Sequence, residues 1–278
     1  MPQTRTLLNR TDTLMVERVV LHASRAQWSP DYTVPTPRSV LASSGPAIDF
    51  RSLGKTVLLD AVTMLCLPAH LSYQMWPWPS DSSCVSSASI VASRPPEGRL
   101  PLCHAPRPVR VQPQAAADSY ILSSFALWQL RLHWHGLAVG QDMAQSSETV
   151  LNAALQSAHR PGVVGGQSHA AVQRAQRFMA QRTAAADACP WTLHDAADAA
   201  CCSLFYLSRQ FRLHMGLSLH GYRQRLRLAT ALQRLEGGER ELAALAHEVG
   251  YCSQSHMGLS FQREIGITPA HARRELTR

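Results

Sequence analysis

Apolar residues in the first half of the chain fall in short runs that turn-forming residues separate. The runs read SVLASS, TVLLDAVTMLCL, CVSSASIVAS and SYILSSFALWQLRLHW, with Gly45-Pro46 and Pro95-Pro96 among the residues between them. Short apolar runs bounded by Gly and Pro are typical of strands. The pattern predicts a mostly β domain, a sandwich or barrel, over residues 1–135. The last run, from Ile121 to Trp134, has the length of a helix as well.

A different pattern begins after residue 135. The segment SSETVLNAALQSAHR has apolar residues at helical spacing, and PGVVGG, from Pro161 to Gly166, then interrupts it. The pattern therefore predicts a linker over residues 136–167, and we expect the main domain boundary within the PGVVGG segment.

From Ser168 to the end of the chain the apolar spacing is helical. Ser168 and Thr192 stand where N-caps are expected, and Gly237-Gly238 follows a long periodic stretch as a helix stop. Residues 168–278 predict an all-α domain of about seven helices. The whole chain then has an α+β, two-domain fold.

A small pattern occurs twice in this helical domain, fifty residues apart. The matched pairs are Ser203 and Ser253, Leu207 and Met257, Phe211 and Phe261, Gly216 and Gly266, Ser218 and Thr268, and Arg223 and Arg273. In each copy a short helix with a small residue, Ala197 or Ala246, precedes a tight turn and a second, Ser-capped helix. This order is typical of the helix-turn-helix. It predicts two such motifs, at about 192–214 and 241–264, and double-stranded DNA as the partner.

The segment between the two motifs predicts a spacer. Residues 219–236 form a helix of about 18 residues, which is about 27 Å long. Two recognition helices that enter successive major-groove turns on one DNA face lie about 34 Å apart. A rigid helix with its flanking turns can span that distance.

Charge and cysteine content are compatible with this interpretation. The net charge is +8 with a pI of about 9.5, and Lys55 is the only lysine. The 7 cysteines include no Cys-x-x-Cys pair, which excludes zinc-ribbon spacing. No apolar stretch is long enough for a signal peptide or a membrane span. We expect a cytoplasmic protein with no membrane partner.

The helical half resembles the AraC/XylS family of bacterial transcription regulators over residues 168–275. The resemblance rests on LSRQF, on Gly216, Ser218 and Tyr222, on RL-x-x-A, on LA-x-E-x-G-Y and on F-x-R-E-x-G-x-TP. It implies a two-motif DNA-binding domain behind a sensor or dimerisation domain. It also implies an activator that a small-molecule effector or partner controls, with RNA polymerase as a protein partner and a homodimer as one oligomeric form.

The N-terminal half resembles the cupin-like β-barrel sensor domains of this family more faintly. Asp60 and Tyr73 in LLDAVTMLCLPAHLSYQM match a family segment, whereas Ala69-His70-Leu71 stands where a glycine is expected. The resemblance implies that residues 1–135 are a cupin-like sensor domain.

The resemblance also indicates which side chains contact base edges. Carried over, they are Phe205, Ser208 and Arg209 in the first motif, and Gln254, Ser255, His256 and Leu259 in the second. An Arg can bind a guanine edge through two hydrogen bonds, and a Gln an adenine edge. Arg209 can equally contact only phosphate, and Phe205 can equally belong to the core, as most aromatic residues do.

Catalytic and metal sites are not expected. His133 and His135 would share one face of a strand, as a cupin metal pair does, but the glutamate of such a site is absent downstream. His256 has no visible acid or nucleophile partner. The cysteines are expected to be small buried apolar residues rather than redox sensors. We expect no enzyme, no catalytic residue, no metal and no cofactor.

Three positions depart from the family pattern and keep alternatives open. Leu204 replaces a common proline, Leu259 replaces a common Arg, and Ala272 replaces an aromatic residue. The main hypothesis is a sequence-specific DNA-binding regulator. The alternatives are a metal-dependent cupin enzyme with a fused helical domain, and a family member that keeps the fold but binds specific DNA weakly. The sequence names neither the effector, the target promoter, the sign of regulation nor the oligomeric state.

Overall fold

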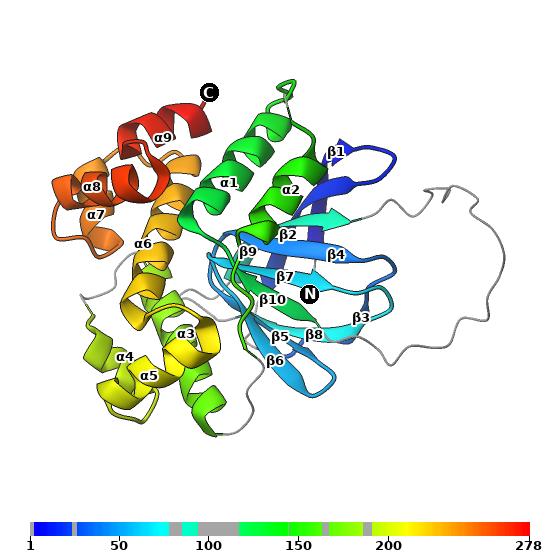
Figure 1. Cartoon of the computed structure of the whole chain (residues 1–278). Helices are drawn as coiled ribbons and strands as arrows, with labels where there is room; N and C mark the ends of the chain where they lie inside the picture. Colours follow the sequence, from blue (N-terminus) through cyan, green and yellow to red (C-terminus); the bar gives the residue numbers. More distant parts are fainter. Residues whose placement is uncertain are drawn as a thin grey trace.

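The structure, a computed structural model, describes residues 3–23, 27–77, 85–93, 117–143, 145–162, 167–185 and 191–278. A mostly β N-terminal domain and an all-α C-terminal domain lie side by side (Figure 1). The predicted fold class is therefore confirmed. Among the described residues, no helix has both the length and the apolar character needed to cross a membrane.

Two antiparallel sheets form the N-terminal domain. The strands are β1 (Gln3–Arg10), β2 (Met15–Ala23), β3 (Tyr32–Thr33), β4 (Arg38–Ser44), β5 (Ile48–Ser52), β6 (Lys55–Leu59), β7 (Thr63–Leu67), β8 (Ser72–Pro77), β9 (Val85–Ser93) and β10 (Asp118–Ile121). One sheet has the order β1-β2-β9-β4-β7-β10 and the other β3-β8-β5-β6. Side chains such as Val19, Leu65, Phe50 and Met75 fill the space between the sheets. This is the arrangement expected of a cupin-like domain.

The long run TVLLDAVTMLCL forms two strands rather than one, because Asp60 turns the chain between β6 and β7. Its carboxylate accepts hydrogen bonds from the Val62 amide at 3.0 Å and from the Thr63 hydroxyl at 2.7 Å. Such bonds from an Asp to groups two and three residues later are typical of turns.

The run from Ile121 to Trp134, grouped with the strands by its composition, is mainly helical. Helix α1 (Ser124–Ala138) begins after Ser123, whose side chain caps it by accepting a hydrogen bond from the Ala126 amide. His133 and His135 therefore lie on a helix, where residues two apart point in different directions. The expectation that they share one strand face was wrong, and the cupin metal pair does not form.

Helix α2 (Ser147–Gln156) lies within the segment predicted as a linker, at the position of its helical spacing. It packs against α1, and both helices lie beside the larger sheet (Figure 1). Of the PGVVGG interruption, residues 163–166 lie outside the described residues, as do Pro95-Pro96 and Cys84, Cys103 and Cys189.

Seven helices follow in the described residues from 167 onward, as predicted. They are α3 (Gln167–Ala184), α4 (Leu193–Ala199), α5 (Leu204–Met215), α6 (Leu219–Glu236), α7 (Leu242–Glu248), α8 (Gln254–Ile265) and α9 (Pro269–Leu276). Helix α6 runs between the group α3–α5 and the group α7–α9 (Figure 1). Thr192 caps α4 as expected. Helix α3 begins at Gln167, so Ser168, expected as its N-cap, lies in its first turn instead.

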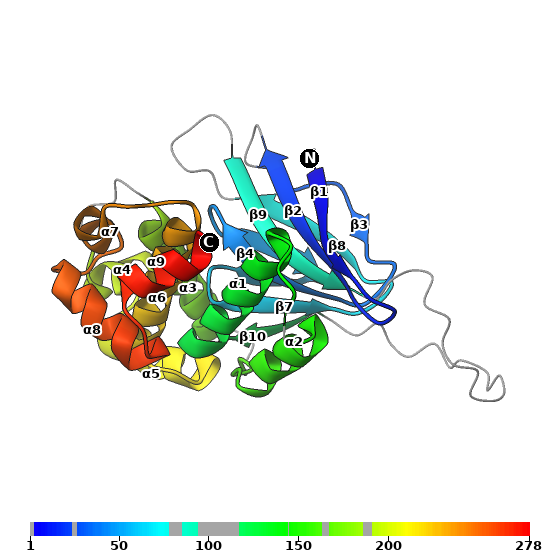
Figure 2. The same ribbon diagram turned by 90° about the horizontal axis from the view of Figure 1, so that it is seen from above.

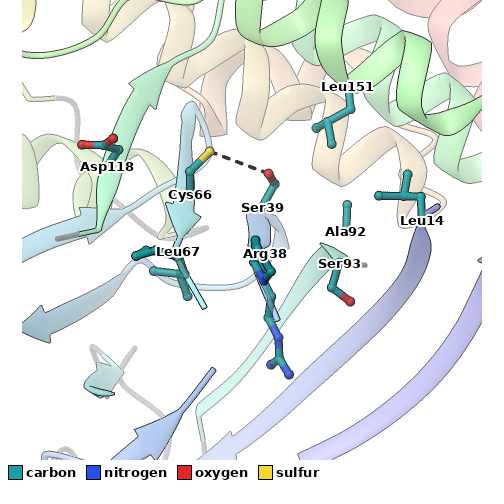
Figure 3. Close-up of a pocket in the computed structure, with 11 residues that line it drawn as sticks. Leu14, Arg38, Ser39, Cys66, Leu67, Ala92, Ser93, Asp118 and Leu151 are labelled. Atoms are coloured by element: carbon teal, nitrogen blue, oxygen red, sulfur yellow. Dashed lines mark hydrogen bonds between the residues drawn. The ribbon is translucent and has the colours of Figure 1, made fainter. Parts of the chain in front are cut away.

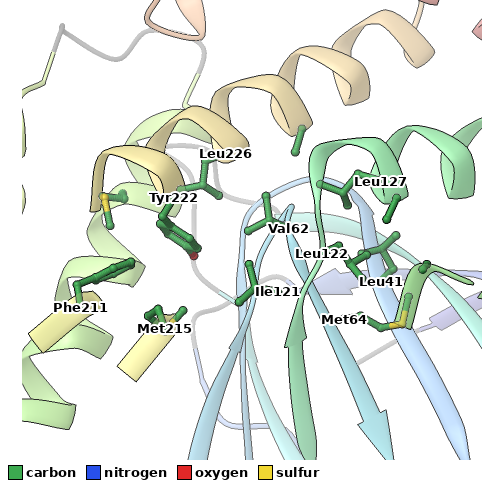
Figure 4. Packing of buried hydrophobic residues seen from close by; sticks show 14 of the residues in the cluster. Leu41, Val62, Met64, Ile121, Leu122, Leu127, Phe211, Met215, Tyr222 and Leu226 are labelled. Atoms are coloured by element: carbon green, nitrogen blue, oxygen red, sulfur yellow. The ribbon is translucent and has the colours of Figure 1, made fainter. Parts of the chain in front are cut away.

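The two domains share one hydrophobic core. Ile121, Leu122 and Val62 of the N-terminal domain pack in the same cluster as Phe211 and Tyr222 of the C-terminal domain (Figure 4). All five residues are at most 1% exposed. Burial of apolar area contributes about 25 cal/mol per Å², so the contact between the domains is a substantial part of the stability.

Buried polar contacts join the domains beside this core. Arg177 of α3 donates two hydrogen bonds to Asp49 of β5, at 3.1 and 2.8 Å. Arg131 of α1 donates to Glu236 of α6 at 2.8 Å and is 3% exposed. Seen from above, α1 lies between the sheets and the helices α6, α8 and α9 (Figure 2). The N-terminal domain thus contacts the helices of both repeats.

Candidate DNA-binding surface

The first predicted helix-turn-helix is formed by α4 and α5. Ser203 caps α5 by accepting a hydrogen bond from the Tyr206 amide, and Gly216 ends it with a φ of 69°. Cys201, in the turn between the helices, has a φ of 55°. This left-handed conformation favours glycine, so the backbone at Cys201 is mildly strained.

The second motif, α7 and α8, repeats the same local chemistry. Ser253 caps α8 by accepting from the His256 amide, and Gly266 ends it with a φ of 77°. Gly250 supplies the left-handed turn residue, with a φ of 89°. The first helices of the motifs are 49 residues apart and the second helices 50. The extra residue, Cys252, lies in the turn of the second motif.

The helix crossing in each motif is close-packed by the residues that the repeat identified. Leu207 and Phe211 in α5, and Met257 and Phe261 in α8, are fully buried at 0% exposure. The small residues Ala197 and Ala246, at 2% and 0% exposure, lie on the opposing first helices. Because this stripe faces the core, the opposite face of each second helix is available for a partner.

Arg223 and Arg273, which occupy equivalent positions in the two repeats and whose role the sequence left open, make the same kind of contact. Arg223 of α6 donates a hydrogen bond to the Trp191 carbonyl just before α4, and its guanidinium lies 4.3 Å from the Trp191 ring centroid. Arg273 of α9 donates to the Arg240 carbonyl just before α7, at 2.7 Å. Each Arg lies on the helix that follows its motif and holds in place the residue just before the motif's first helix. Desolvation, together with the nearby Arg227 charge, lowers the pKa of Arg223 to about 10.

Most of the predicted base-contacting residues lie on the exposed faces of α5 and α8. In α5, Phe205 is 82% exposed and therefore not part of the core, and Ser208 and Arg209 are exposed. In α8, Gln254 and Ser255 are exposed, and Leu259 is 73% exposed. Arg209 and Leu259 occupy equivalent positions in the two helices.

His256 is the exception among these residues, because it is half-buried. Its ring packs edge-on against Tyr251, with centroids 5.3 Å apart, and its Nδ1 lies 3.0 Å from the Cys252 Sγ. The ring is held at the N-terminal turn of α8, so it can reach a groove only from the rim of the exposed face.

Two of the departures from the family pattern are buried rather than exposed to a partner. Ala272 is 0% exposed and packs in the core of the second motif, and Leu204 is half-buried against the core that the domains share. Leu259 alone of the three departures changes the exposed face.

A hollow lies in the N-terminal domain, between Leu151 of α2 and the larger sheet (Figure 3). Its volume is about 300 Å³. The Cys66 Sγ points into it, 3.7 Å from the Ser39 Oγ. Burial raises the pKa of the Cys66 thiol, which keeps the thiol protonated and poorly reactive.

His133, one of the two histidines that suggested a cupin metal site, contacts a neighbouring helix instead. His133 Nε2 lies 2.9 Å from the Ser147 Oγ, and burial lowers the pKa of His133. Among the residues that the structure describes, no group of three or more His, Cys, Asp or Glu side chains is arranged to hold a metal ion.

Comparison with known proteins agrees with this geometry. Residues 196–275 match the family model described as "Helix-turn-helix domain". An AraC-like transcription regulator of Streptomyces lividans is 36% identical over 87 residues, which are 31% of this chain and 29% of that protein. The transcriptional activator RhaR of Escherichia coli strain K12 is 29% identical over 92 residues, 33% of each chain.

A solved structure with similarity over the length of the chain is ToxT from Vibrio cholerae. It is 9% identical, covers 96% of this chain and 100% of its own, and gives a TM-score of 0.37. The chain covers 29% and 33% of the lengths of the two curated relatives above. The similarity to those relatives therefore concerns about a third of this chain.

Proposed function

We propose that this chain, whose residues 196–275 are a helix-turn-helix domain of the AraC type, is a sequence-specific DNA-binding transcription regulator. The observation that carries the proposal is the repeat itself. Two Ser-capped helices, α5 and α8, each bury one stripe and expose the opposite face. The 18-residue helix α6 joins the two motifs. Its length of about 27 Å suits two recognition helices that enter successive turns of the major groove.

The exposed face of each second helix, with His256 at its rim, supplies the proposed base contacts. These are Phe205, Ser208 and Arg209 in α5, and Gln254, Ser255, His256 and Leu259 in α8. Arg209 would contact a guanine edge and Gln254 an adenine edge. The net charge of +8 favours approach to the phosphate backbone.

The N-terminal domain is proposed to control this activity. We assign residues 1–135 to a sensor and dimerisation domain, 136–167 to the segment between the domains and 168–278 to DNA binding. Because the N-terminal domain shares a core with α5 and contacts α8, a small-molecule effector bound to it can alter their positions. RNA polymerase as a partner, activation as the sign of regulation, a homodimer and a cytoplasmic location belong to the same proposal, as does the absence of enzymatic activity.

One second candidate is supported by a specific residue. Leu259 is 73% exposed on α8, where an Arg would offer two hydrogen-bond donors and Leu offers none. A member that keeps the fold but binds specific DNA weakly would fit this substitution. The cupin enzyme receives no such support, because His133 and His135 lie on a helix.

The test is to map the genomic fragments that the full-length protein binds in its own host's DNA, and then to measure their affinities by fluorescence anisotropy. A regulator enriches a limited set of fragments that share a motif. The logarithm of its binding constant for them falls linearly with the logarithm of the salt concentration, with a slope of about −0.9 per neutralised phosphate. Equal affinity for every fragment would favour the weakly specific candidate, and no salt-dependent binding would contradict both.

A further inference from the structure

A large cavity lies between the two domains. Its volume is about 630 Å³, whereas the space inside the barrel is about 40 Å³ and the hollow beneath α2 about 300 Å³. Strands β6 and β10 line it from the sensor side, and α3 and the end of α5 from the other. Ligand cavities generally occupy about 300–1,000 Å³ and are common at domain interfaces. The sensor and the first recognition helix therefore border one cavity of suitable size.

The wall of this cavity combines apolar and polar residues, and its ionisable groups are mainly basic. Ten of its 19 lining residues carry polar side chains. The ionisable ones are Lys55, Asp118, Arg160, His169 and His214. The one carboxylate among them, Asp118, accepts a hydrogen bond from Arg160, so Lys55 and the two histidines are left to face a ligand. The remaining wall consists of nine apolar or glycine residues and of hydroxyl and amide residues that include Thr56 and Ser119.

The two histidines carry polar atoms that the protein leaves unused. His169 of α3 and His214 of α5 have ring centroids 5.7 Å apart. The Nδ1 atom of each is buried without a hydrogen-bond partner in the structure, and His214 is only 2% exposed. The other ring nitrogen of His214, Nε2, lies 3.3 Å from the Ser168 Oγ. An unsatisfied buried polar atom is costly and needs an explanation, and two of them belong to side chains that line one cavity.

We propose that this cavity binds a small hydroxylated organic anion, whose carboxylate or phosphate group is contacted by His169 and His214. The hydroxyl groups of the ligand match the Thr56 and Ser119 hydroxyls of the wall, and Lys55 adds a positive charge at the edge. The proposal rests on the proposed function, because it identifies the class of effector that a regulator of this kind would sense.

The charge state of the pair adds a pH dependence. Desolvation lowers the pKa of both His169 and His214, and the nearby His169 lowers that of His214 further. Both rings are therefore neutral near pH 7 in the free protein. An anion between them favours their protonated form and raises both pKa values. The affinity for the anion should therefore increase as the pH falls towards about 5.5.

The cavity also reaches the recognition helix directly. His214 and Met215, both lining residues, are the last two residues of α5. The Gly162 amide donates a hydrogen bond to the His214 carbonyl at 2.7 Å. The His159 ring occupies the place that a side chain at Gly216 would need. A ligand that shifts the His214 ring must therefore act on the end of α5 and on the segment packed against it.

The test is isothermal titration of the full-length protein, without DNA, with three probes: gluconate, glucose 6-phosphate and glucose. The two anions distinguish carboxylate from phosphate recognition, and glucose is their neutral match. We expect at least one anion to bind, more tightly at about pH 6 than at about pH 8, and glucose to bind at least about tenfold more weakly. Equal binding of glucose, or no binding of either anion, overturns the proposal.

Variants then locate the site. His214→Gln and His169→Gln should each weaken binding of the anion at least about tenfold and remove its pH dependence. His247→Gln, at an exposed position on α7, is the matched control and should have no effect. If a variant does not fold by circular dichroism, titration of the wild-type imidazoles by NMR decides instead. The anion must then raise two histidine pKa values, and unchanged values contradict the proposal.

A separate measurement keeps this inference apart from the proposed function. DNA affinity is measured by anisotropy with and without the bound anion. Anion binding without DNA binding would leave the site intact and contradict the proposed function. DNA binding without anion binding would contradict only the site.

Discussion

The hydroxyl group of Tyr222, in the helix that joins the two motifs, donates a hydrogen bond to the carboxylate of Asp60, 162 residues earlier in the turn between β6 and β7. Asp60 is 1% exposed and Tyr222 0%. Gln176 of α3 donates to the same carboxylate oxygen at 3.4 Å. One carboxylate of the N-terminal domain thus holds two helices of the C-terminal domain within the shared core.

Removing the Tyr222 hydroxyl should destabilise the contact between the domains. Tyr222→Phe keeps the ring but leaves one Asp60 oxygen with fewer donors, and a hydrogen bond to a charged group is worth about 1.5–3 kcal/mol. Urea unfolding should show a loss of that size. Tyr206→Phe, at a position 40% exposed on α5, is the control and should be neutral. Equal stabilities of the two variants would contradict the role of the buried bond.

Asp60 also predicts a specific pH dependence of stability. Desolvation raises its pKa in the folded protein, and the bonds from Tyr222 and Thr63 oppose this only in part. A carboxyl whose folded pKa is raised binds its proton more tightly in the native state. Its contribution is therefore full below the unfolded value of about 3.9 and is lost as the pH rises through the folded pKa.

The measurement is the melting temperature of the wild type and of Asp60→Asn across this range. Asn cannot titrate, so the wild type should lose stability relative to the variant as the pH increases. A difference that stays constant with pH would show that Asp60 has the same pKa in the folded and unfolded chains.

The second motif offers a matched pair of leucines for a test of burial. Leu245 of α7 is 0% exposed and Leu259 of α8 is 73% exposed. Leu245→Asp buries an unpaired carboxylate, which costs several kcal/mol, whereas Leu259→Asp should change the stability by less than about 0.5 kcal/mol. Thermal unfolding followed by circular dichroism compares them. Similar melting temperatures would mean that Leu245 does not support the motif.

Arg209 is the strongest candidate for direct base recognition in the first motif. Arg209→Ala should weaken binding to a mapped site by about 1–3 kcal/mol and relax the preference at one base pair. Arg240→Ala, exposed between α6 and α7, is the control and should bind as the wild type does. Uniform weakening across all sequences would assign Arg209 to a phosphate contact instead.

Local chemistry explains which features could be predicted from the sequence. The caps Ser203 and Ser253, the helix stop at Gly216 and the stripe at Phe211 act within one or two turns of their own helix, so their spacing reveals them. The bounds of α6, residues 219–236, agree with the prediction for the same reason.

The remaining features depend on contacts between residues distant in the chain. The sequence marked Asp60 and Tyr222 separately, yet no spacing rule joins residues in different domains. The cavity between the domains arises in the same way, because His169 and His214 come from different helices. The apolar run of α1 was ambiguous because its partners lie on both sides of it: Leu127 is buried in the shared core and Trp128 in that of the second motif.

The last prediction concerns the difference between the two reading helices. Arg209 and Leu259 occupy equivalent exposed positions on α5 and α8. An Arg there can donate two hydrogen bonds to a guanine edge, whereas a Leu can donate none and at best contacts a thymine methyl group. The second motif keeps Gln254 and Ser255 on its exposed face and should still dock. We therefore expect unequal half-sites, with the stronger base preference in the half bound by the first motif.

A base-by-base substitution scan of a mapped site, with the wild type and Leu259→Arg, measures this difference. The variant should bind more tightly, because the new guanidinium adds a phosphate or guanine contact worth about 1–3 kcal/mol when it pairs with a guanine edge. Leu259→Met keeps an apolar side chain and is the control for changes in shape alone. A native site with a thymine methyl group against Leu259 would reverse the sign at that base pair only. If the half-site bound by residues 253–265 tolerates fewer base substitutions than the half-site bound by residues 203–215, the proposal that the first motif has the stronger base preference is wrong.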